Sequence, residues 1–126
     1  MLFRSLNVSE EDIDKISKAI LYHAGNIKKE TSDKNLSIEA RILRDADNID
    51  AFGAIGLIRM ISFCRDNNFP LFKSKEDWLN ESVYGGVRAV ISWQKSMLTK
   101  EGKILGEKRI RIMEQFLNEL EREVNG

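Results

Sequence analysis

The chain has 126 residues, of which 42% are hydrophobic and 32% charged, so it suits one globular domain and is unlike a disordered or fibrous protein. Its 20 basic and 20 acidic residues cancel, which excludes the overall attraction that nucleic acids and anionic membranes exert on basic proteins. Cys64 is the only cysteine, so an internal disulfide is excluded and a reducing compartment is expected.

The N-terminal segment carries no targeting pattern. Residues 1–12 gain acids early and lack the apolar run of a signal peptide. The longest apolar stretch, residues 51–61, is broken by Arg59 and is too short to span a bilayer. We therefore expect a cytoplasmic protein without membrane or nucleic-acid partners.

Apolar residues recur at helical spacing along the chain, and Pro70 is the only proline, so we predict an all-α fold. Ser9 precedes three acids and is expected to cap a first helix over residues 10–22. The apolar face of this helix comprises Ile13, Ile16, Ile20 and His23. Ser37 is expected to cap a short helical piece over residues 38–43.

Further helices are predicted over residues 47–65, 87–98 and 103–124. Another is expected to begin at residue 75, capped by Ser74 and interrupted at Gly85-Gly86. The clearest apolar stripe lies on the last helix and comprises Leu105, Ile112, Met113, Phe116, Leu117, Leu120 and Val124. Because no linker divides the chain, residues 1–126 are predicted to form a single all-helical domain.

An acidic pair leads into a glycine-bearing helix. Asp47 and Asp50 are three residues apart and project from one side of a helix. Buried carboxylates would need a metal, a cation or donated hydrogen bonds, so the pair is a candidate site. Gly53 and Gly56 cost the helix roughly 1 kcal/mol each, which suggests that another helix packs very close. Alternatively, both acids face water in the first turn.

Two other residues have structural readings beside functional ones. Asp45 is predicted to lie just before the helix, where its carboxylate can cap exposed N–H groups. His23 lies near the end of the first helix, where a histidine either bonds a free carbonyl or contributes to a site.

Residues 45–59 resemble a signature of one branch of the HD superfamily of metal-dependent phosphohydrolases. That signature reads Asp-Ala-Asp, a variable residue, Leu, Asp, Ala, then Gly-Ala-Ile-Gly and a following Arg. Ile49 stands where Leu is usual and Phe52 where a smaller aliphatic is usual, and both stay apolar. Matching residues elsewhere are Ala19-Ile20, His23, Ser37, Glu39, Ala40, Met97-Leu98-Thr99, Gly102, Arg109, Met113, Phe116-Leu117 and Glu123.

The resemblance implies a helical bundle that binds a divalent metal (Mn, Ni, Mg, Fe or Zn) through His…His-Asp…Asp and acts on a nucleotide or small phosphate ester. Asp47 would be the last metal ligand, with Asp45 and Asp50 orienting it or capping. His23 and Asp50 are the catalytic candidates, and His23 would contact the substrate phosphate or add a ligand. Arg59 would bind an anionic group of the substrate, unless it forms a structural salt bridge.

Most of the family's ligands are missing. The first His and the His-Asp pair precede the Ala-Ile…His element in the family, whereas His23 is the only histidine here and is followed by Ala24. The chain therefore resembles the C-terminal portion of an HD domain, with too few ligands for tight metal binding. We expect little or no phosphohydrolase activity from this chain alone.

Three origins fit this pattern: a fragment, one half of a split enzyme, or a degenerate relative. Without the N-terminal helices, apolar faces would be uncovered, so we expect self-association or a partner chain. The alternative function is a catalytically inactive helical interaction module derived from the HD fold, which would need no metal.

Overall fold

The computed structural model describes residues 5–23, 36–74, 76 and 81–126, and within these ranges the chain is helical and contains no strand. The predicted all-α fold is therefore confirmed. The elements in chain order are α2 (Glu10–Tyr22), α3 (Ile38–Asp50), α4 (Gly53–Asp66), α5 (Val83–Ser92), the 3-10 helix η2 (Trp93–Ser96) and α6 (Lys100–Asn125).

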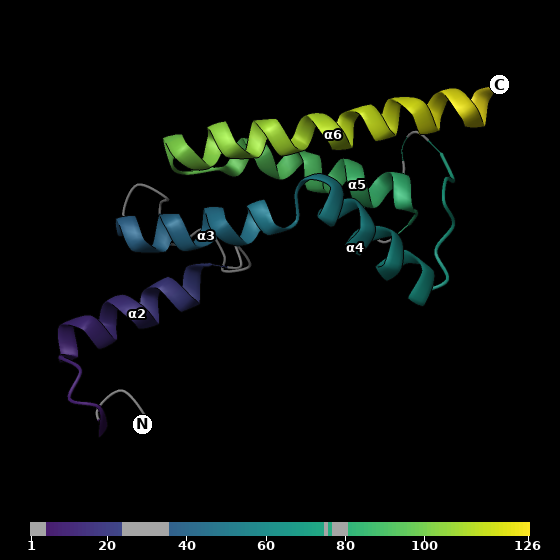
Figure 1. Cartoon of the computed structure of the whole chain (residues 1–126). Helices are drawn as coiled ribbons and strands as arrows, with labels where there is room; N and C mark the ends of the chain where they lie inside the picture. Colours follow the sequence, from purple (N-terminus) through teal and green to yellow (C-terminus); the bar gives the residue numbers. More distant parts are fainter. Residues whose placement is uncertain (1–4, 24–35, 75, 77–80) are drawn as a thin grey trace.

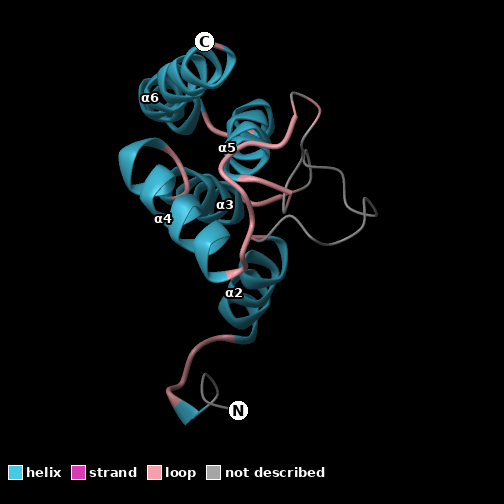
Figure 2. Cartoon of the chain, turned by 90° about the vertical axis from the view of Figure 1, so that its right-hand side faces the viewer, coloured by secondary structure: helices cyan, strands magenta, loops and turns pink. Residues whose placement is uncertain are grey.

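The longest helix, α6, organises the bundle. It runs beside α5 and also packs against α3 and α4, while α4 packs against α5 (Figure 1). The outermost described helix is α2, which packs on α3 at the far side from α6 (Figures 1 and 2). The core comprises Phe52, Leu57, Cys64, Val83, Tyr84, Val87, Val90, Met97, Ile110, Met113, Leu117 and Leu120. None of the described helices is long and apolar enough to cross a membrane.

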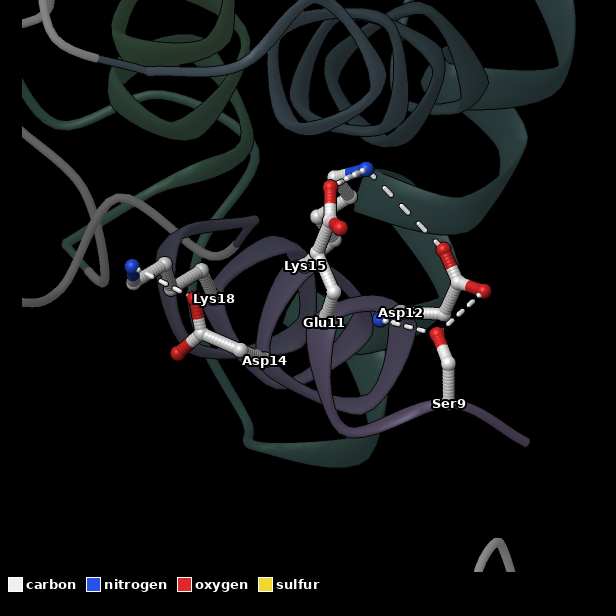
Figure 3. A network of polar contacts seen from close by, with 6 residues as sticks. All are labelled: Ser9, Glu11, Asp12, Asp14, Lys15 and Lys18. Atoms are coloured by element: carbon white, nitrogen blue, oxygen red, sulfur yellow. Dashed lines mark hydrogen bonds and ion pairs between the residues drawn. The ribbon is translucent and has the colours of Figure 1, made fainter. Parts of the chain in front are cut away.

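The predicted bounds of α2 are confirmed, and its cap is the expected one. The Ser9 hydroxyl accepts a hydrogen bond from the backbone N–H of Asp12 at 3.1 Å. On the outer face, Lys15 pairs with Glu11 and Lys18 with Asp14, each at 2.7 Å (Figure 3). These contacts raise the pKa values of both lysines, chiefly through the hydrogen bonds to their carboxylate partners.

The boundary between α3 and α4 differs from the prediction. Ser37 does cap α3, accepting from Ala40 N–H at 3.3 Å, but the helix continues to Asp50 instead of ending at residue 43. The chain then turns at Ala51 and Phe52, and α4 begins at Gly53. We call this turn, residues 51–53, the elbow. It separates Asp47 and Asp50 from the helix that carries the glycines.

Both glycines serve the elbow. Gly53 has a φ of +79°, which L side chains rarely adopt. A Cβ on Gly56 would lie 1.8 Å from the Ala51 carbonyl oxygen, so glycine is required for that close approach. The predicted helix contact holds only at Gly53, where a Cβ would lie 3.3 Å from Arg109 Cβ on α6.

The second half of the chain also departs from the prediction. Gly85 and Gly86 do not interrupt a helix, because both are buried inside α5. A Cβ on Gly86 would lie 2.4 Å from Met60 Sδ, so this glycine lets α4 and α5 approach closely. The predicted helix start at residue 75 lies outside the described residues.

The stripe on α6 is only partly covered. Met113, Leu117 and Leu120 are buried in the core, as predicted. Leu105 and Ile112, however, are 44% and 45% exposed, so part of the predicted apolar face has no cover in the described structure.

Candidate functional site

A cleft of about 370 Å³ opens where the end of α3, the face of α4 and the end of α5 meet. It contains three of the predicted site residues, Asp47, Asp50 and Arg59. The remaining lining residues are Ala51, Gly56, Met60, Phe63, Val90 and Trp93. The cleft therefore combines charged side chains with an apolar and aromatic wall.

The elbow brings Arg59 back to the end of α3. The Arg59 guanidinium forms an ion pair with the Asp50 carboxylate and donates a hydrogen bond to the Asp50 carbonyl oxygen at 3.3 Å. A cation is favoured there, since the last carbonyls of a helix carry partial negative charge. The structural salt bridge considered for Arg59 is thus present, and both side chains remain largely exposed at 59% and 70%.

Asp47 is placed differently from Asp50. It is exposed and lines the cleft, and the described residues provide it with neither a hydrogen bond nor an ion pair. Its carboxylate oxygens are therefore accessible from the cleft, whereas Asp50 already has a guanidinium partner.

Asp45 lies inside α3, not before a helix, and caps α6 from across the bundle. It is 2% exposed. Its carboxylate accepts hydrogen bonds from the backbone N–H groups of Leu98 at 2.8 Å and Thr99 at 2.7 Å, and from the Thr99 hydroxyl at 2.6 Å. A Cβ on Gly102 would lie 2.3 Å from Asp45 Oδ2, so glycine is needed beside this carboxylate. The predicted capping capacity is real but serves α6.

His23 ends α2 and does not line the cleft. Its Nδ1 hydrogen bonds with the Ile20 carbonyl oxygen at 2.5 Å. This is the carbonyl contact that the sequence position allowed. Arg109, by comparison, reaches the end of α3, where its Nη1 donates to the Ile49 carbonyl oxygen at 3.0 Å.

The described residues do not by themselves fit a metal cage. Among them, no group of three or more His, Cys, Asp or Glu side chains could hold a metal ion. The cleft contributes two acids, Asp47 and Asp50, and one of these is paired with Arg59.

The sequence reasoning missed the apolar wall of the cleft. Gly56, Arg59, Met60 and Phe63 follow the i, i+3, i+4, i+7 spacing of one helix face, so part of it could have been found from the pattern. Trp93 comes from the start of η2, and nothing in its local sequence indicates that it faces α4.

No family model matches the chain. YpgQ of Bacillus subtilis, an uncharacterised protein, is 28% identical over 120 residues, which cover 94% of this chain and 56% of YpgQ. The crystal structure of YpgQ in complex with ADP superposes with a TM-score of 0.77 at 25% identity, covering 99% of this chain and 59% of that one. The structure of an HD-superfamily hydrolase from Bacillus thuringiensis gives a TM-score of 0.63 at 26% identity, covering 98% and 69%.

These relatives are longer than this protein, which spans less than two thirds of the YpgQ chain. The similarity covers nearly every residue here and includes a named HD-superfamily hydrolase. The chain therefore has an all-helical, HD-like fold.

Proposed function

We propose that this chain is the C-terminal portion of a metal-dependent HD-type phosphohydrolase that acts on a nucleotide or small phosphate ester. The observation that carries the proposal is the cleft in which Asp47, Asp50 and Arg59 converge. Two similarities support it. One is to an HD-superfamily hydrolase, and the other is to YpgQ, which was crystallised with ADP.

Each residue of the cleft has a role in the proposal. Arg59 binds the substrate phosphate, because a guanidinium offers paired donors that match phosphate oxygens. Asp50 is the catalytic candidate that also holds Arg59 in place. Asp47 contributes one metal ligand. Asp45 fixes α3 against the start of α6 and so positions the helix that carries Asp47.

The metal needs more ligands than the described residues of this chain provide. We propose that the others come from a segment with a His and a His-Asp pair, supplied by a partner chain. His23 is kept as a candidate for contact with the substrate phosphate, and its bond to the Ile20 carbonyl would have to break for this role.

The test is phosphate release from ADP in the presence of Mn²⁺ or Ni²⁺. The chain alone should show only background turnover, because most metal ligands are absent. Adding the part of YpgQ that lies outside the region of similarity should raise turnover above background. Robust turnover by the chain alone would contradict the proposal that it depends on a partner, and no turnover by the combined chains would contradict the assigned activity.

A second candidate function is an inactive helical interaction module. One observation favours it: a groove of about 450 Å³ between α3 and the start of α6 is lined by exposed Ile38, Ile42 and Leu105. Metal content discriminates the two functions, because the module needs no metal when a partner is bound.

A further inference from the structure

We infer that the apolar wall of the cleft binds a nucleobase, so that the substrate class is nucleoside phosphates rather than simple sugar phosphates. The wall comprises Met60, Phe63, Val90 and Trp93. The inference rests on the proposed function only for the phosphate end of the cleft, at Arg59.

The cleft has a charged end and an aromatic end. Arg59 lies at the elbow, where it pairs with Asp50. Phe63 is one helical turn further along the same face of α4, about 6 Å away along the helix axis. A ligand that fills both ends therefore needs an anionic group and, next to it, an apolar flat group. Nucleoside phosphates have both, whereas sugar phosphates lack the second.

Two aromatic side chains are more exposed in this wall than their size favours. Phe63 is 45% exposed and Trp93 is 37% exposed, although both have large apolar surfaces that gain free energy from burial. The cleft volume of about 370 Å³ lies within the range of small-molecule pockets, roughly 300–1,000 Å³.

The wall is held from behind. The Phe63 ring packs against Phe69 with centroids 6.2 Å apart and planes tilted by 57°. Met60 is pressed against α5 at Gly86, where no Cβ could be accommodated without moving its sulfur. Trp93 starts η2, whose Ser96 hydroxyl donates to the Trp93 carbonyl oxygen at 2.7 Å. A wall fixed in this way loses little conformational freedom when a base binds.

The test compares three ligands: adenosine, ADP and ribose 5-phosphate. The chain contains a second tryptophan, Trp78, so the measurements use the Trp78→Phe background, in which Trp93 is the sole tryptophan. Adenosine and ADP should quench Trp93 fluorescence in a saturable way, and ribose 5-phosphate should not. Affinities come from isothermal titration calorimetry, and far-UV circular dichroism checks that each variant is folded.

Substitutions at the wall should affect only ligands with a base. Trp93→Leu should weaken adenosine and ADP by about 5- to 150-fold, the range expected for loss of one base–aromatic stack. It should leave ribose 5-phosphate unchanged, and Trp93→Phe, which keeps a flat ring, should retain most of the affinity. Phe63→Leu provides a second variant should Trp93→Leu fail to fold.

Failure of this inference and failure of the proposed function are distinguishable. The base seat is overturned if adenosine does not bind, or if Trp93→Leu weakens ADP and ribose 5-phosphate equally, as a general disturbance of the fold would. Arg59→Ala should weaken ADP and spare adenosine. If it spares both while Trp93→Leu weakens both, the base seat stands and the assigned phosphate site is wrong.

Discussion

At the scale of single residues, Asp45 shows how a motif acid can have a structural role. The Asp-Ala-Asp run offers two similar carboxylates two positions apart. They project from different sides of α3: Asp45 is buried against the start of α6, and Asp47 is exposed in the cleft. Only the first has its oxygens occupied by three donors from Leu98 and Thr99.

Replacing Asp45 with alanine should lower the free energy of unfolding by about 2–4 kcal/mol, since a cap is lost and buried N–H groups are left without an acceptor. Urea unfolding at constant slope measures the change. Asp66→Ala is the control, because Asp66 is exposed at the end of α4 and should change stability by less than about 0.5 kcal/mol. Equal losses in both variants would show that Asp45 is not a structural cap.

Tyr84 gives the fold a dependence on alkaline pH. Its hydroxyl donates to Glu121, and this hydrogen bond, followed by burial, raises the pKa of Tyr84 above its ordinary value of 10.0. A raised folded pKa stabilises the fold fully below the unfolded pKa, and the contribution is lost as pH rises through the folded value. Unfolding between pH 8 and 11 should therefore lose more stability in the wild type than in Tyr84→Phe. Parallel curves would contradict this.

At the scale of elements, the elbow between α3 and α4 builds the site. It turns α4 so that Arg59 meets the end of α3, and it depends on the Gly56–Ala51 approach. Without the turn, one continuous helix would keep Asp50 and Arg59 on a common rod, two and a half turns apart, and Arg59 could not contact the Asp50 carbonyl.

Gly56→Ala should destabilise the protein by about 2 kcal/mol or more, because the new methyl group would collide with a backbone carbonyl that cannot move freely. Thermal unfolding followed by circular dichroism measures this. Ser62→Ala, an exposed change on the same helix, should be nearly neutral. If Gly56→Ala is equally neutral, the elbow is not constrained as described.

The helices were predictable where local chemistry determines them, and less so where tertiary contacts do. Ser9 and Ser37 marked two helix starts correctly because an N-cap is a local hydrogen bond. The elbow was missed because its cause, the positive φ of Gly53, leaves the helical spacing of apolar residues on both sides undisturbed. The resemblance indicated Asp47, Asp50 and Arg59, but Trp93 reaches the cleft only through the packing of α5.

At the scale of the whole molecule, much apolar surface is uncovered. In the described structure Ile38 and Ile42 are 57% and 55% exposed, and they line the groove between α3 and α6. A surface of this kind favours association with another chain. We therefore expect the purified protein to self-associate when no partner is supplied.

Ile42→Glu should shift the protein toward monomer, as measured by gel filtration with light scattering, because a carboxylate in the groove would be desolvated on association. Ile104→Glu is the matched control: Ile104 is 49% exposed and does not line the groove. A wild-type monomer, or an equal shift in both variants, would show that this groove is not the contact surface.

The central claim, that this chain supplies one ligand to a shared metal site, is tested most directly by metal content. The chain is purified together with the part of YpgQ outside the region of similarity, and bound manganese is measured by inductively coupled plasma mass spectrometry. The account predicts metal in the complex, its loss with Asp47→Asn, and its retention with Asp66→Asn. Equal metal content in all three, or none in any, would contradict it.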